Sequence, residues 1–201
     1  MPVARKPRLR AKPPEARREE LLNAAQSLFL AHGVAQTTIE QITSGATVAK
    51  GTFYLYFSSK EDLLSALGER FDEKLLAGIK AAVARIEDGD WQGRLAAWAD
   101  AAVSGYLDSM QLHDVLFYEA RPLSRAWLTD NIVIDHLTAL LEAGVAAKSW
   151  SIEDCLATAI FLFSGLHGLV DHAIAKERRV NRLRLALQLQ QLCFRAVGLK
   201  A

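Results

Sequence analysis

Cysteines and long apolar runs are scarce in this chain of 201 residues. Its two cysteines, Cys155 and Cys193, are too few for a disulfide framework and are typical of a reducing compartment, although a single pairing between them stays open. The longest apolar stretch, around residues 155–170, is interrupted by polar residues and glycine, whereas a bilayer span needs roughly 20 predominantly apolar residues. The N-terminus is charged and has no apolar signal core. We therefore expect a cytoplasmic protein without a membrane segment.

Net charge is also low, at +1, but it is unevenly divided. Residues 1–60 contain nine Lys and Arg against four Asp and Glu, so this part carries +5 and the remainder −4. Residues 1–14 contain five basic residues, four prolines and no acid. We expect these residues to form a flexible basic arm, which either follows DNA or only aids solubility. A basic head on a mildly acidic remainder suits a protein whose N-terminal part meets a polyanion.

Two short helices joined by a tight turn are predicted after the first long helix. Thr38 is followed three residues later by Gln41, which is the spacing of a capping box, and the helix it begins should end near Gly45. Thr47 is expected to cap a second short helix over about residues 48–56 through its hydroxyl group. This arrangement is a helix-turn-helix.

The second short helix is expected to have two different faces. Its apolar residues recur at every fourth position and predict a buried face, which consists of Ala49, Phe53 and Phe57. Lys50, Gly51 and Tyr54 lie opposite. A cation, a residue without a side chain and a phenol suit close approach to phosphates and base edges, although an ordinary solvated face has a similar composition.

Residues 48–57, together with Ser59, Lys60 and the Glu-Asp-Leu that follows, resemble the DNA-binding signature of TetR-family transcriptional regulators. The resemblance extends over about residues 17–65, with Thr47 where the family often has glycine and Ala49 where it often has serine. It implies contacts to phosphates, to bases or to the nearby DNA backbone from Thr37, Thr38, Thr47, Lys50, Gly51, Thr52, Tyr54, Tyr56 and Lys60.

The expected fold is all-α, with about nine helices. After the arm of residues 1–14, residues 15–60 should form a three-helix helix-turn-helix DNA-binding domain, and residues 61–201 a helical domain for effector binding and dimerisation. Ser58 or Ser59 should cap a long helix over residues 60–86 that links the two. Five further helices are expected at residues 91–110, 112–120, 123–147, 151–177 and 181–199. The last segment also alternates like a strand, but its Leu, Ala, Arg and Gln favour a helix.

The final two predicted helices are more apolar than one flank of a helical domain can cover. We expect them to pair with the same helices of a second copy in a four-helix bundle, as the family resemblance also implies; filling a monomer core is the alternative. A homodimer with two heads implies a palindromic double-stranded DNA operator, bound in successive major grooves.

Aromatic and histidine side chains in the second domain suit a cavity for an unknown small-molecule effector. The candidates are Trp98, Tyr106, Phe117, Trp127, His136, Phe161 and His167. Two sets of residues are candidates for catalytic or metal-binding groups, namely His113 with Asp114, and His167 with Asp171 and His172. However, His167 and His172 are five residues apart and point to different helix faces, unlike a metal-binding pair. We expect no enzyme activity, cofactor or metal. The favoured function is a ligand-responsive repressor; the alternative is an architectural or division-control DNA-binding protein of the same fold without a ligand.

Overall fold

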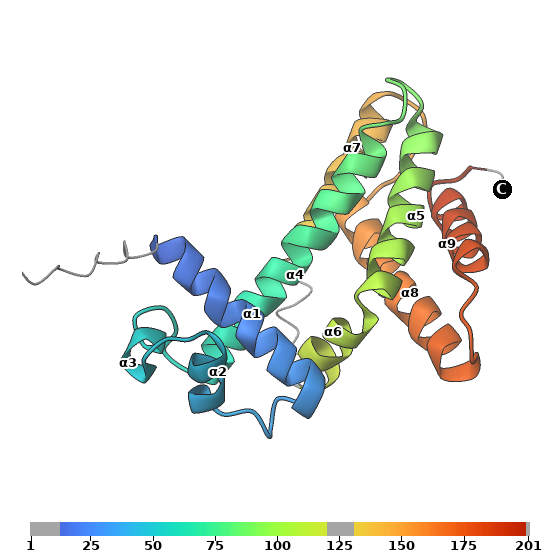
Figure 1. Ribbon diagram of the computed structural model, residues 1–201. Coiled ribbons are helices and arrows are strands. Elements are labelled where there is room, and N and C mark those ends of the chain that lie inside the picture. The colour runs from blue at the N-terminus through green and yellow to red at the C-terminus, as the bar shows by residue number, and fades with distance from the viewer. Residues whose placement is uncertain (1–12, 120–130, 200–201) are drawn as a thin grey trace, which may run out of the picture. The chain divides into compact units, whose positions relative to one another are not determined.

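The computed structural model describes residues 13–119 and 131–199 (Figure 1). All regular elements within these ranges are helices, as expected. They are α1 (Pro14–His32), α2 (Ile39–Gly45), α3 (Lys50–Phe53), α4 (Lys60–Val83), α5 (Trp91–Asp108), α6 (Met110–Asp114), the π-helix η1 (Val115–Glu119), α7 (Ile132–Ala146), α8 (Cys155–Lys176) and α9 (Arg182–Ala196). The chain divides into two compact units, Met1–Leu67 and Gly68–Ala201, here called the N-terminal and C-terminal units. The first twelve residues of the predicted arm, and Trp127, lie outside the described residues.

Helix α1 supports the N-terminal unit through one fully buried stripe. Leu21, Leu22, Ala25 and Phe29 are completely shielded from solvent. The helix begins with proline at its first position, where no backbone N–H is needed. It ends at Gly33, whose φ of 77° is readily adopted by glycine. The predicted stop at Gly33 is therefore confirmed.

The two short helices follow the predicted order but differ in length. Helix α2 begins at the Thr38 capping box and ends at Gly45, as predicted. Helix α3 is only four residues long, and its N-cap is Ala49, without a side-chain hydrogen bond. The prediction that Thr47 caps this helix is wrong, because Thr47 lies in the turn with a φ of 56°. The apolar face is also smaller than predicted, since Phe53 and Phe57 are buried but Ala49 is exposed.

Helix α4 starts where its serines predict. The Ser59 hydroxyl oxygen accepts a hydrogen bond from the backbone N–H of Asp62 at 3.1 Å. The Asp62 carboxylate in turn accepts one from the backbone N–H of Ser58 at 2.7 Å. Leu63 and Leu67, in the first two turns, are almost fully buried and belong to the N-terminal unit. The division between the units thus falls after Leu67, seven residues later than the boundary expected from the sequence.

The C-terminal unit is held together by packed helix pairs, one of which joins helices that are distant in sequence. Helix α5 packs against α9, and α7 packs against α8 (Figure 1). After α7 the chain folds back so that the Trp150 ring covers Gly144, and Trp150 Nε1 donates to the Leu141 carbonyl oxygen at 2.8 Å. A Cβ atom at Gly144 would lie 2.0 Å from the ring, so only glycine fits beneath it.

Helices α8 and α9 each begin after a residue whose side chain caps the first turn. Helix α8 is capped by Asp154, whose carboxylate accepts from the Ala157 N–H at 2.8 Å, so the predicted start at Ser151 is wrong. Asn181 caps α9, and the ambiguous last segment is a helix as predicted. The helix predicted for residues 112–120 is instead α6 followed by the π-helix η1.

Helix α8 has one buried and one exposed side. Its 22 residues, with a mean hydropathy of 1.3 over the most apolar window, are long and apolar enough to cross a membrane by length and composition alone. One side packs into the core through Leu162, Leu166 and Val170. The exposed apolar side chains of α8 and α9 are Leu156, Phe161, Leu183, Leu187 and Leu192. Both cysteines are free thiols, and burial raises the pKa of Cys193 to about 12.

Candidate nucleic-acid interface

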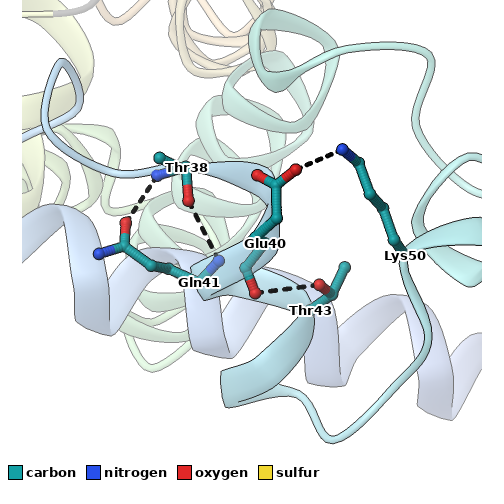
Figure 2. Close-up of polar contacts among 5 residues, drawn as sticks. All are labelled: Thr38, Glu40, Gln41, Thr43 and Lys50. Atoms are coloured by element: carbon teal, nitrogen blue, oxygen red, sulfur yellow. Dashed lines mark hydrogen bonds and ion pairs between the residues drawn. The ribbon is translucent and has the colours of Figure 1, made fainter.

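The start of α2 is fixed by a complete capping box (Figure 2). The Thr38 hydroxyl oxygen accepts from the Gln41 N–H at 3.2 Å, and the Gln41 side-chain oxygen accepts from the Thr38 N–H at 2.8 Å. The Thr43 hydroxyl donates to the Glu40 carbonyl oxygen at 3.1 Å, one turn further on. These local bonds position the first turn of α2, where Thr38 and Glu40 are exposed.

Lys50, the first residue of α3, forms an ion pair with Glu40 of α2 (Figure 2). Both side chains are more than half exposed, at 53% and 61%. The hydrogen bond to Lys50 lowers the pKa of Glu40, and the hydrogen bond to Glu40 raises the pKa of Lys50. The two groups are therefore fully charged at neutral pH and accessible from solvent.

Gly51 and Tyr54 complete the exposed surface of α3 and the turn after it. A Cβ atom added to Gly51 would meet nothing within 4 Å, so the space in front of this residue is open. Tyr54 is 52% exposed, and its ring packs edge-on against the buried Phe53 at 5.4 Å. Phe53 thereby anchors α3 while Lys50, Gly51 and Tyr54 face solvent, as the sequence predicts.

Two residues of the predicted interface make contacts inside the N-terminal unit instead. Thr37 is 1% exposed and donates its hydroxyl hydrogen to the Gly33 carbonyl oxygen at 2.8 Å. Lys60 Nζ donates to the carbonyl oxygens of Val34 and Thr37 at 2.8 and 3.1 Å. Both residues hold the loop between α1 and α2. Of the other predicted residues, Thr38 and Thr47 are exposed, whereas Thr52 and Tyr56 are half-buried.

A cluster of aromatic and polar side chains lies in the C-terminal unit and includes three of the predicted effector residues. The Tyr106 hydroxyl of α5 donates to an Asp171 carboxylate oxygen of α8 at 2.6 Å. The His113 ring lies 4.2 Å from the Tyr106 ring, 4.5 Å from the Phe117 ring and 5.4 Å from the His167 ring, measured between centroids. We call Tyr106, His113, Phe117, His167 and Asp171 the histidine cluster.

Both histidines of the histidine cluster are held neutral. Burial lowers the pKa of His113 to about 4, and the neighbouring His167 adds to the effect. Burial also lowers the pKa of His167. His167 Nδ1 lies 2.9 Å from the Phe163 carbonyl oxygen, and because a carbonyl only accepts, this nitrogen carries the proton. His167 is one of the effector residues predicted from the sequence, whereas His113 stands out there only as a candidate for catalysis or metal binding.

A groove of about 400 Å³ lies beside the histidine cluster, between the later part of α4 and α5. Its lining combines Phe71, Leu75 and Gly78 of α4 with small and polar residues of α5. The Phe71 ring lies 6.0 Å from both the His113 and Phe117 rings, so it is shared by the groove and the histidine cluster. Volumes of this order are typical of small-molecule sites.

The remaining predicted effector residues lie apart from the histidine cluster. Trp98 is fully buried in the hydrophobic core, and its Nε1 has no hydrogen-bond acceptor among the described residues. His136 is half-buried, and burial together with the charge of Lys80 lowers its pKa. Phe161 is 67% exposed on α8, which does not fit the expectation that it lines a cavity.

These features define an all-helical protein with an N-terminal helix-turn-helix and a separate helical C-terminal unit. Residues 21–67 match the family model for bacterial regulatory proteins of the tetR family. The N-terminal unit is therefore similar to that of TetR-family transcriptional regulators, a family that binds DNA and dimerises.

Individual relatives match the chain to different extents. It is 31% identical to the regulator TcmR of Streptomyces glaucescens in an alignment 104 positions long, which covers 43% of this chain and less than half, 46%, of TcmR. It is 25% identical to the regulator SrpR of Pseudomonas putida over 86% of this chain and 83% of SrpR. The crystal structure of RolR in complex with resorcinol matches with a TM-score of 0.67 and 23% identity, over 94% of this chain and 90% of RolR, and supports the fold.

Proposed function

We propose that this chain is a cytoplasmic transcriptional repressor that binds a palindromic operator as a homodimer and releases it when a small molecule binds. The observation that carries this proposal is the exposed surface formed by Lys50, Gly51 and Tyr54 beside the capped start of α2. This surface lies within the residues that match the family model. It combines a cation, open space and a phenol, which suit the major groove.

Each group has a defined part in the proposed DNA complex. Lys50 donates to a base edge, and Gly51 lets the α3 backbone approach the DNA without a side chain in between. Thr38 and Tyr56 contact flanking phosphates. We expect Lys50→Ala to weaken operator binding by roughly 1 to 3 kcal/mol, the usual worth of a good base contact. A gel-shift titration measures this, and an unchanged affinity would contradict the assignment of Lys50.

The proposed dimer forms through α8 and α9. Phe161, Leu183 and Leu187 are exposed on these helices, and a Cβ at Gly165 or Gly168 would meet no atom within 4 Å. This exposed surface is apolar where a second copy would cover it, and the glycines allow close helix approach. We expect sedimentation at twice the 22.1 kDa mass of one chain, and a Phe161→Asp variant that sediments as a monomer. A wild-type monomer at micromolar concentration would overturn the dimer.

The proposed effector binds at the groove and the adjoining histidine cluster. Phe71 connects the two, and Phe117 and His113 provide stacked rings beside it. Aromatic walls with a few polar groups suit a small aromatic molecule. RolR was solved with resorcinol, which makes small phenols the first class to screen. A bound molecule that favours the DNA-free dimer by 1 to 3 kcal/mol would release the operator.

A footprint of the full chain on DNA flanking its own gene tests the proposed function. We expect two protected half-sites about one helical turn apart, because the two heads of a dimer enter successive major grooves. A panel of small phenols is then added, with thermal shift and footprint as readouts. Protection without any phenol-dependent release would instead favour the architectural alternative, and the absence of protection would reject DNA-binding regulation at this locus.

A further inference from the structure

Lys50, the exposed cation of α3 in the candidate interface, already has an ion-pair partner in the DNA-free chain. Lys50 is ion-paired with Glu40, ten residues earlier in sequence and on a different helix. An exposed ion pair contributes little to folding stability, because solvent screens it and two long side chains must be ordered. The pair is therefore poorly explained as a stabilising contact, although it lies at the centre of the surface proposed to meet DNA.

We infer that Glu40 is a specificity-determining residue, which together with Lys50 recognises a G·C base pair in the major groove. This inference rests on the proposed DNA-binding function. The major-groove edge of a G·C pair presents two acceptors on guanine beside an amino donor on cytosine. Lys50 offers donors for guanine O6 and N7, and the Glu40 carboxylate accepts from cytosine N4. The ion pair thus presents the complementary pattern, a donor next to an acceptor.

The surroundings of Glu40 fit this role. Its backbone is fixed by the Thr38–Gln41 capping box and by the Thr43 hydroxyl, while its carboxylate is held on the exposed side toward Lys50 (Figure 2). The bond to Lys50 lowers the pKa of Glu40, so the carboxylate remains an acceptor at neutral pH. Both side chains have more than half of their surface exposed and can reach a base edge without unfolding α2 or α3.

The same carboxylate should suppress binding to other sequences. Where no cytosine amino group is available, Glu40 meets the polyanion without a donor, and Lys50 reaches a phosphate only by leaving its partner. Glu40 therefore weakens non-specific binding as well as contributing to recognition. A lysine alone would do the opposite, since phosphate contacts strengthen binding to every sequence.

The test uses the full chain, wild type and Glu40→Gln, to select from a pool of random duplexes. Glu15→Gln is the matched control, because Glu15 is an exposed acid of the same unit and its loss changes the net charge equally. We expect the wild type to enrich a G·C pair at one position of each half-site, with a preference of roughly 5- to 150-fold. Lys50→Ala should lose the preference at that position and Glu40→Gln should reduce it several-fold, whereas Glu15→Gln should keep it.

A salt titration on a non-operator duplex provides the second readout. Glu40→Gln should bind this duplex several-fold more tightly than the wild type and the Glu15→Gln control, with a salt slope steeper by about 0.9 for one added phosphate contact. An unchanged base preference and an unchanged slope in Glu40→Gln would overturn the inference while leaving DNA binding intact. A wild type that enriches no sequence would reject the proposed function itself.

Discussion

The candidate interface of the N-terminal unit and the histidine cluster of the C-terminal unit place their polar groups differently. In the N-terminal unit, the Thr38–Gln41 bonds and the Glu40–Lys50 pair join residues close in sequence and remain exposed. In the C-terminal unit, Tyr106 and Asp171 are 65 residues apart and meet beside buried His113. Exposed groups can exchange their partners for an external ligand, whereas buried ones affect folding stability when a partner is lost. We therefore expect substitutions in the exposed groups of the N-terminal unit to change DNA recognition. Substitutions in the histidine cluster of the C-terminal unit should change folding stability.

The largest expected effect is an acid response of the C-terminal unit through His113. Its pKa is about 4 in the folded chain against 6.5 as the ordinary value. Because the folded pKa is the lower one, the unfolded chain binds more protons as the pH falls below 6.5, and stability falls with it. We expect a loss of up to about 3 kcal/mol by pH 4, with His167 contributing in the same direction. Urea unfolding at several pH values measures it.

His113→Phe provides the control for the acid response, because phenylalanine retains a ring of similar size but cannot bind a proton. Most of the loss between pH 6.5 and 4 should disappear in this variant. An equally steep loss would show that the acid response belongs to other groups, such as His167.

The next largest loss of folding stability is expected from the hydrogen bond between Tyr106 of α5 and Asp171 of α8. Tyr106→Phe removes the hydroxyl that donates to Asp171 at 2.6 Å, and we expect a loss of about 2 kcal/mol because the acceptor is a carboxylate. Tyr54→Phe is the matched variant in the N-terminal unit, where the phenol is half exposed, and its stability should stay near that of the wild type. Equal losses in the two variants, measured by urea unfolding, would contradict the contrast between the units.

A smaller loss is expected at the start of α2. Thr38→Ala removes the hydroxyl oxygen that accepts from the Gln41 N–H, which typically costs about 1 kcal/mol. Thr38→Ser retains the oxygen and should recover most of the stability. Thermal unfolding of the two variants distinguishes the cap from the loss of a methyl group, since a deficit shared by both would point to packing.

The smallest expected effect is a gain in folding stability at the turn before α3. Thr47 has a φ of 56°, in the left-handed region that favours glycine. Thr47→Gly should therefore stabilise the N-terminal unit by about 0.5 kcal/mol, since relief of backbone strain exceeds the added chain entropy. Lys148→Gly is the counterpart in the C-terminal unit, with a φ of 61°. A lower melting temperature for Thr47→Gly would show that the threonine side chain contributes more than its strained backbone costs.

Helix starts and ends were predictable from the sequence where the interactions that fix them are local. The Thr38 capping box, the stop at Gly33 and the cap at Ser59 each depend on residues at most four apart, and all three were predictable. The shortness of α3 was not, because the helical period continues through residues 54–56, which instead form turns.

The site could be predicted only in part for the same reason. Lys50, Gly51 and Tyr54 share one face of a short segment and were identified from their spacing. The Glu40–Lys50 pair depends on how two helices meet across the turn, and the histidine cluster on how α5, α6 and α8 pack. Spacing along one helix contains no information about either arrangement. Phe161 shows the converse, since an aromatic residue on an apolar helix is exposed here.

Operator binding by Gly51→Leu tests most directly whether the exposed surface of α3 is where DNA binds. A Cβ atom added at Gly51 meets no atom of the described residues within 4 Å, so the fold should persist while the leucine blocks the approach of DNA. Ala81→Leu is the control, because Ala81 is also exposed on a helix but lies in the C-terminal unit, outside the groove. We predict at least a roughly tenfold loss of affinity for Gly51→Leu, about 1.4 kcal/mol, with an unchanged melting temperature, and wild-type affinity for Ala81→Leu. Wild-type affinity in a folded Gly51→Leu variant would contradict the account.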